Sequence, residues 1–249
     1  MIYIKELTLF EYLQDKDVVV CNRTFKDSFM ENEENIYNQI ITAHELHRIL
    51  MGYYINGTTR ISSTVGKKIE KTKVILKILE DEMIKNKEKS NNDLMKNFLL
   101  ENGENIIKKA KEGLMKVECI SYRELIKRSM RKNEMCLGKI DRSNLRVRES
   151  IEIGRVKYIS YNMVEEDIYS YIKQLNINGN KEKYIDFYVD IAKLTEESKQ
   201  YILALMSIPM DTLKLFGRYK KHEAGDSNSK LIRILDSMQE AYNLEVLEG

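Results

Sequence analysis

The residues best suited to chemistry lie in one stretch, Met135–Ile172, which begins with a polar loop. In that loop Lys139 and Arg142 stand close together and could hold an anionic ligand. A wider basic cluster surrounds them in sequence: Lys127, Arg128, Arg131, Lys132, Lys139, Arg142, Arg146 and Arg148. Such clusters can bind phosphate groups or nucleic acid with salt-dependent affinity. Aromatic residues do not interleave with this cluster and acidic residues are scattered through it, so its simpler interpretation is a solvated surface.

The elements that must position this loop are two short strands and a helix. Roughly alternating apolar residues predict strands at Leu145–Arg148 and Arg155–Ser160, just after a polar turn that contains Asn144. An acidic and then aliphatic pattern predicts the start of a helix at Glu165–Ile172. We therefore expect a small β-hairpin framed by helices, with a polar loop at its mouth. Kinases hold their catalytic groups in such an arrangement.

The loop sequence MCLGKIDRSNL, Met135–Leu145, resembles the catalytic loop of the aminoglycoside phosphotransferase-like kinases, in their spore-coat (CotS-like) branch. Cys136, Gly138 and Asn144 fall in register with that family's loop, L-C-H-G-D-x-x-x-H-N. In the family a hairpin ending in Ile-Asp-Phe follows, and then an aspartate that opens a helix. The resemblance implies a protein-kinase-like large lobe of α+β class, predominantly helical.

The same comparison shows which family residues this chain lacks. The catalytic aspartate corresponds to Lys139, and Ser143 and Asn144 lie in the remainder of a degenerate loop. At the metal-binding strand, Ser160 stands where the aspartate of Ile-Asp-Phe is expected. Asp167 matches the aspartate that buttresses the loop, so we expect it to accept hydrogen bonds from loop amides. The resemblance thus implies a retained scaffold without catalytic carboxylates, and no metal or cofactor site.

The N-terminal part is too short for a complete kinase small lobe. Strands are predicted at Ile2–Ile4 and Val18–Cys21, and no glycine precedes Gly52, so no glycine-rich phosphate loop fits there. We interpret residues 1–32 as vestigial small-lobe strands and a hinge, and residues 33–249 as the helical large lobe with its hairpin near 145–160. Loss of the lobe would leave an apolar hinge-side surface that dimerisation could cover.

Helical periodicity covers most of the remaining chain. The predicted helices are Glu33–Tyr54, Lys67–Asn86, Asn91–Leu114, Tyr122–Met130, Glu165–Leu175, Lys183–Leu194, Ser198–Ile208, Asp211–Tyr219 and Lys230–Tyr242. Ser198–Ile208 is nearly all apolar and is expected to be the most buried, with Pro209 ending it. His44 and His47 are three residues apart, but without a third ligand we interpret them as packed or capping histidines. The run from Leu194 to Tyr219 also resembles the C-terminal part of CotS-like proteins.

Composition sets the broad class. The chain has 249 residues, 43% of them hydrophobic, with 41 basic against 39 acidic residues and a net charge of +2. This balance gives no general electrostatic argument for binding nucleic acid or a membrane. Cys21, Cys119 and Cys136 are widely spaced, which favours a reducing compartment over a disulfide framework. No apolar run approaches the length of a membrane helix. We expect a soluble cytoplasmic protein, in a spore-associated setting if the family resemblance extends that far.

The function that these observations favour is that of a pseudokinase, a kinase-like protein that binds but does not catalyse. Phosphoryl transfer needs cations held by a carboxylate and a group that orients the acceptor, and these are missing. We expect no enzymatic activity, and a protein partner or a second copy of the chain, with spore coat formation as the setting that the resemblance implies.

Two alternatives remain open at this stage. The chain could be a residual phosphotransferase-like protein that binds a phosphorylated or anionic small molecule through Lys139 and Arg142. It could also be a helical module that binds nucleic acid through the basic cluster 127–148, which the charge balance makes the weaker alternative.

Overall fold

A computed structural model describes residues 7–26, 32–53, 61–85, 93–177, 180–223 and 228–247. The predicted strand Ile2–Ile4 lies outside the described residues. The protein is a mostly helical α+β protein, and its residues form two compact units. Unit 1 contains residues 1–65 and 121–202, and unit 2 contains residues 66–120 and 203–249. The units do not separate at residue 32, and a vestigial small lobe in residues 1–32 stays a prediction.

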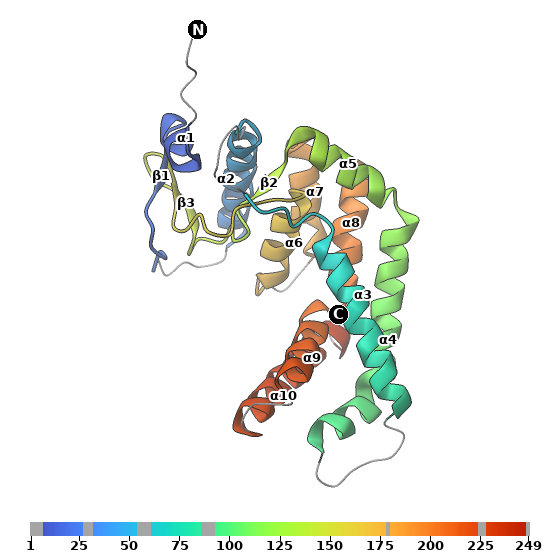
Figure 1. Ribbon diagram of the computed structural model, residues 1–249. Coiled ribbons are helices and arrows are strands. Elements are labelled where there is room, and N and C mark those ends of the chain that lie inside the picture. The colour runs from blue at the N-terminus through green and yellow to red at the C-terminus, as the bar shows by residue number, and fades with distance from the viewer. Residues whose placement is uncertain are drawn as a thin grey trace. The chain divides into compact units, whose positions relative to one another are not determined.

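A three-stranded sheet in unit 1 carries the loop of interest (Figure 1). Its strands are β1 (Val18–Val20), β3 (Leu145–Val147) and β4 (Ile151–Ile153), in the order β1-β4-β3. β1 pairs with β4 in parallel, and β3 pairs with β4 in the antiparallel sense. The β-branched run at Val18 is therefore a strand, as its composition predicts.

The predicted hairpin is present, but its second strand was placed wrongly. Leu145 pairs with Ile153 and Val147 with Ile151, so the hairpin closes within residues 148–150 and ends before Arg155. Residues 155–159 are not a strand. Instead β5 (Ser160–Tyr161) pairs with β2 (Met135–Cys136), which directly precedes the loop. Residues 151–153 and 155–160 both alternate in polarity. β3 pairs with the nearer segment, residues 151–153, because only a tight turn is needed to reach it.

Helices surround these strands: α1 (Leu9–Asp15), α2 (Glu33–Met51), α5 (Tyr122–Lys132), α6 (Glu165–Gln174), α7 (Glu182–Ile191) and the first part of α8 (Glu196–Ser207). α1 was not predicted, because its apolar pattern is short. A capping box nevertheless marks its start: the Thr8 hydroxyl accepts from the Glu11 amide, and the Glu11 carboxylate accepts from the Thr8 amide at 2.8 Å. α2 packs against α7 and against β3.

The most continuously buried helix is α6, contrary to the expectation for Ser198–Ile208. In α6 the three acidic residues Glu165, Glu166 and Asp167 are buried together with Ile168, Tyr169, Tyr171 and Ile172. α8 buries Tyr201, Ile202 and Leu205 but exposes Glu196 and Glu197. Hydrophobicity alone failed here because three carboxylates entered the core with hydrogen-bonding partners.

Unit 2 contains α3 (Lys67–Lys85), α4 (Leu94–Cys119), α9 (Met210–His222), α10 (Asn228–Tyr242) and a π-helical turn, η1 (Asn243–Leu247). α9 and α10 lie side by side (Figure 1). Pro209 separates α8 from α9, as predicted. Glu245 in η1 caps α9, since its carboxylate accepts from the amides of Asp211 and Thr212, each at 2.9 Å.

Within the described parts of the chain, no helix combines the length and the apolar character needed to cross a bilayer.

Candidate functional site

The loop between β2 and β3 is closed by Asn144, which is buried. Its side-chain oxygen accepts from the Arg155 amide at 2.7 Å, and its side-chain nitrogen donates to the carbonyl oxygens of Lys139 at 2.9 Å and Arg155 at 3.3 Å. Both ends of the Asn144 amide are therefore bonded to backbone groups. Asn144 ties the loop to the segment that follows β4.

Asp167 fixes the other side of the loop from the first turn of α6. Its carboxylate accepts from the Leu137 amide at 2.8 Å and from the Gly138 amide at 2.9 Å. These are the loop-amide contacts expected of Asp167 from the sequence. Gly138 has φ +80°, and a side chain there would approach the Tyr158 carbonyl to 3.0 Å, so both conformation and space require glycine.

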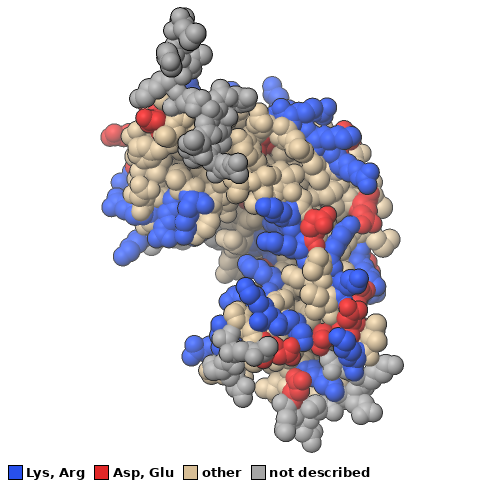
Figure 2. All heavy atoms as spheres, in the orientation of Figure 1, with Lys and Arg blue, Asp and Glu red and all other residues tan. Residues whose placement is uncertain are grey.

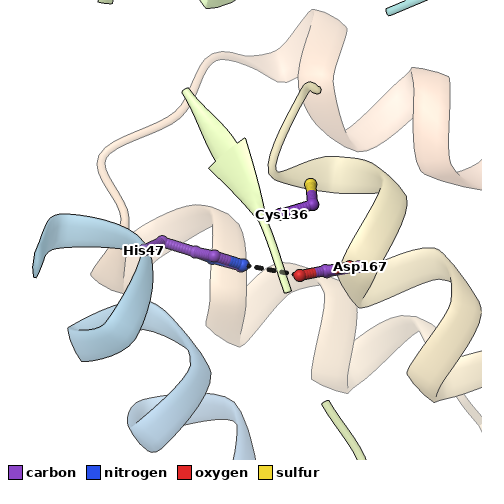
Figure 3. A group of neighbouring side chains, drawn as sticks. All are labelled: His47, Cys136 and Asp167. Carbon is purple, nitrogen blue, oxygen red and sulfur yellow. Dashed lines mark hydrogen bonds and ion pairs between the residues drawn. The ribbon is translucent and has the colours of Figure 1, made fainter. Parts of the chain in front are cut away.

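His47 completes the support from α2. One ring nitrogen lies 3.0 Å from the Asp167 carboxylate and the other 2.9 Å from the Tyr188 hydroxyl, and Figure 3 shows the imidazole meeting Asp167 beside β2. His47 is buried, so its interpretation as a packed histidine is confirmed. About two turns earlier in α2, the side-chain nitrogen of Gln39 donates to the carbonyl oxygens of Ile140 at 2.6 Å and Leu145 at 2.9 Å. α2 thus holds both ends of the loop.

His47, Cys136 and Asp167 lie within 4.8 Å of one another and resemble a metal-ligand set. Their atoms are already committed, however. The Cys136 thiol donates to the Met163 carbonyl at 3.0 Å, and both oxygens of Asp167 accept from the loop. Burial, with the nearby carboxylates of Asp167 and Glu166, raises the pKa of the Cys136 thiol well above its ordinary value. These hydrogen bonds make the cluster a support for the loop.

A buried ion-pair network adjoins this support. Arg128 in α5 binds both oxygens of Glu134 at 3.0 Å, and its guanidinium also donates to Glu165 at 2.8 Å and to the Ser198 hydroxyl at 2.9 Å. Burial opposes the charge of Arg128, but the bonds to Glu165 and Glu134 outweigh it and raise its pKa above the ordinary value. Sequence reasoning missed this network and counted Arg128 among surface cations.

The basic cluster 127–148 is therefore not one surface. Arg128 is internal, and Arg146 is buried, with its guanidinium 2.6 Å from Glu152 and 3.8 Å from the centre of the Phe25 ring. Lys127 is paired with Glu124 at 2.6 Å. These pairings remove much of the charge that a nucleic-acid surface would need.

The predicted site residues have separate positions. Lys139 is exposed, with its ammonium group 3.6 Å from Asp141, whereas Arg142 and Ser143 are half-buried in the turn before β3. Ser160 is buried in β5, where its hydroxyl lies 2.9 Å from that of Thr64. Lys139 and Asn144 lie in the loop, and Asp167 contacts that loop from α6. Ser160 lies in β5, which pairs with β2.

The hairpin ends earlier than the sequence predicted, at Ile153. The residues directly after it are Gly154 and Arg155, and the backbone of Arg155 is bonded to Asn144. The assignment of the family's metal-binding position to Ser160 stays a prediction, and Ser160 lies in β5. None of these three residues carries a carboxylate.

Comparison with known proteins supports the fold. The chain is similar to the crystal structure of an aminoglycoside phosphotransferase from Alicyclobacillus acidocaldarius, with a TM-score of 0.64 and 12% sequence identity. The alignment covers 91% of this chain and 65% of that structure, so the chain spans about two thirds of the enzyme's length. No protein-family model and no curated protein sequence matches the chain. The chain therefore shares the fold of the aminoglycoside phosphotransferase class of kinase-like proteins.

The role of Asp167 can be tested by Asp167→Asn. The amide would place a donor against the amides of Leu137 and Gly138, so we expect the free energy of unfolding to fall by about 2–4 kcal/mol. Denaturant unfolding followed by circular dichroism measures this loss. Asp190→Asn, at an exposed residue of α7, is the matched control and should change stability by less than about 0.5 kcal/mol. Equal effects of the two substitutions would contradict the assigned role.

The three thiols should differ in reactivity. All are free, but Cys119 is exposed, Cys21 is half-buried and Cys136 is buried with a raised pKa. In the folded protein at pH 8 we expect a thiol-specific reagent such as Ellman's reagent to modify Cys119 rapidly and to leave Cys136 unmodified until a denaturant is added. Cys136→Ser should then remove only the denaturant-dependent fraction. Rapid labelling of Cys136 in the folded protein would refute its neutral, hydrogen-bonded state.

Proposed function

We propose that the protein is a non-catalytic member of the kinase-like class, a pseudokinase that acts by binding. The observation that carries the proposal is the charge of the residues around Asn144. By the motif register, Lys139 stands where the catalytic aspartate is expected and Ser160 where the metal-binding aspartate is expected, and Gly154 and Arg155 directly follow the hairpin. In kinases that use this site, Mg²⁺ is held by that aspartate and by the loop asparagine.

The hydrogen bonds of Asn144 support the same proposal. Its side-chain oxygen already accepts from the Arg155 amide, and its nitrogen faces two carbonyl oxygens. A hard cation such as Mg²⁺ prefers carboxylate oxygens, whereas Arg155 brings a positive charge to that place. An acceptor hydroxyl beside Lys139 would meet an ammonium group in place of a carboxylate base.

We also propose the finer assignments suggested by the sequence: a CotS-like relationship, a role in spore coat formation, a cytoplasmic location and a vestigial small lobe. The motif register at Cys136, Gly138 and Asn144 supports the relationship.

The proposal predicts no nucleotide turnover. Purified protein incubated with ATP and Mg²⁺ or Mn²⁺ should release no phosphate above the buffer background, because neither a metal-holding carboxylate nor a base is present. Release of inorganic phosphate and loss of ATP are measured together. Lys139→Asp alone should stay at background, since it restores only one of the missing groups.

Contaminating enzymes are separated from intrinsic activity by Asn144→Ala. Any activity that persists equally in this variant does not come from the loop. Turnover by the wild-type chain that disappears in Asn144→Ala would overturn the proposal.

We further propose that the partner is a second copy of the chain, bound at β1. This strand lies at the edge of its sheet and pairs only with β4 among the described residues. It consists of three valines without a protective charge, and Val19 is 47% exposed, close in sequence to Phe10 of α1, which is 42% exposed. An edge strand without charged side chains favours pairing with an identical strand.

Light scattering coupled to size-exclusion chromatography tests this interface. We expect the wild-type chain to have twice the monomer mass of 29.4 kDa, and Val19→Lys to shift it to the monomer, because a charge on β1 opposes strand pairing. Val74→Lys, at a valine of α3 that is 59% exposed, is the control and should stay dimeric. A monomeric wild-type chain, or dissociation by both substitutions, would exclude the β1 interface.

A further inference from the structure

Several exposed cations lie around the loop. The Asn144 side-chain nitrogen bonds the carbonyl oxygens of both Lys139 and Arg155, which places these two residues side by side. The backbone of Arg23 also reaches this point, since a side chain on Gly154 would lie 2.5 Å from the Arg23 carbonyl oxygen. Lys139, Arg155 and Arg23 are all exposed. A concentration of positive charge therefore adjoins the loop.

Lys157 and Tyr158 extend this cluster. Tyr158 packs against Gly138, and the Lys157 ammonium group lies 4.7 Å from the centre of the Tyr158 ring. Tyr158 is 47% exposed, and its pKa is lowered by the hydrogen bond and charge of Lys157 and by the charges of Arg155 and Lys139. All three cations therefore lower the pKa of the Tyr158 hydroxyl, which is expected if their charged groups lie near that hydroxyl.

The cations beside the loop differ from exposed lysines that form close ion pairs elsewhere, such as Lys73 with Glu118 and Lys183 with Glu33, both at 2.7 Å. In the part of the chain that the structure describes, Arg155 and Lys157 have no carboxylate within ion-pair distance, and Lys139 has only Asp141, at 3.6 Å. Figure 2 shows Lys and Arg side chains gathered over the region of the β3–β4 hairpin. Such a surface attracts anions.

We propose that Lys139, Arg155 and Lys157 form a metal-independent binding site for the phosphate groups of a small polyanion, with the Tyr158 hydroxyl as an additional hydrogen-bond donor. This inference rests on the proposed function, since it names the ligand class of a protein that acts by binding. In this site the positively charged side chains, and not a metal ion, neutralise the charge of the phosphate groups. Arg155 and Lys157, which the sequence analysis did not select, replace Arg142 in this role.

The site predicts how divalent cations act on binding. Without a carboxylate to hold it, Mg²⁺ would compete with the side chains for the phosphate oxygens. Tripolyphosphate should therefore bind in the presence of EDTA, and excess Mg²⁺ should weaken binding. Increasing salt should weaken it as well, because the cations are exposed.

Isothermal titration calorimetry with tripolyphosphate in EDTA tests the proposal. We expect Arg155→Ala and Lys157→Ala each to weaken binding about fivefold, the effect of one exposed charge at close range. Both side chains are exposed and Arg155 contacts Asn144 only through its backbone, so circular dichroism should show both variants folded. Lys77→Ala, at an exposed lysine of α3, is the control and should bind like the wild type.

Comparison of ligands identifies the source of the phosphate groups. ATP binding as tightly as tripolyphosphate would show that the site recognises phosphates alone, and tighter binding of ATP would add a contact to the nucleoside; either result supports the site. No binding in EDTA, a requirement for Mg²⁺, an equal loss in Lys77→Ala, or much tighter binding of a single-stranded oligonucleotide would overturn it. Nucleotide turnover would instead refute the proposed function, so the two failures are distinguishable.

Discussion

The arrangement of unit 1 depends on the burial of one carboxylate, that of Asp167. Burying a negative charge is unfavourable unless hydrogen bonds replace the lost water, and here two loop amides and the His47 ring do so. These bonds join α2, the loop after β2 and α6, three segments far apart in sequence. Because each segment supplies part of the compensation, none can shift without leaving a buried polar group unpaired.

The neighbouring residues of α6 extend the same principle. Glu165 is fully buried and accepts from Arg128, and Glu166 is buried and accepts from the Tyr201 hydroxyl at 2.7 Å. A polar, hydrogen-bonded core thus lies beside the loop, and its buried carboxylates maintain the shape of the loop.

Much of this fold follows from the sequence. Helical periodicity located α2, α3 and α9, the valine run located β1, and the loop register located Asp167 correctly. The errors have a common physical origin. Periodicity does not reveal which of two alternating segments pairs with β3, and composition does not reveal that Arg128 and Glu165 are buried together. Both depend on contacts between residues that are distant in sequence. Likewise, the position of Arg155 and Lys157 beside the loop could be recognised only from the position of β4.

Unit 1 is discontinuous along the chain, since residues 66–120 of unit 2 separate its two parts. His47 and Asp167 are 120 residues apart in sequence. The chain between them must close into a long loop, at a cost in conformational entropy, before their contact can stabilise the fold. The entropy of closure grows only logarithmically with loop length, so the cost at equilibrium is modest. The kinetic consequence is larger, because α2 leaves the ribosome well before α6 exists and must wait for its partner. Synthesis from the N-terminus therefore allows the inserted helices to form before the segments on either side of them can join.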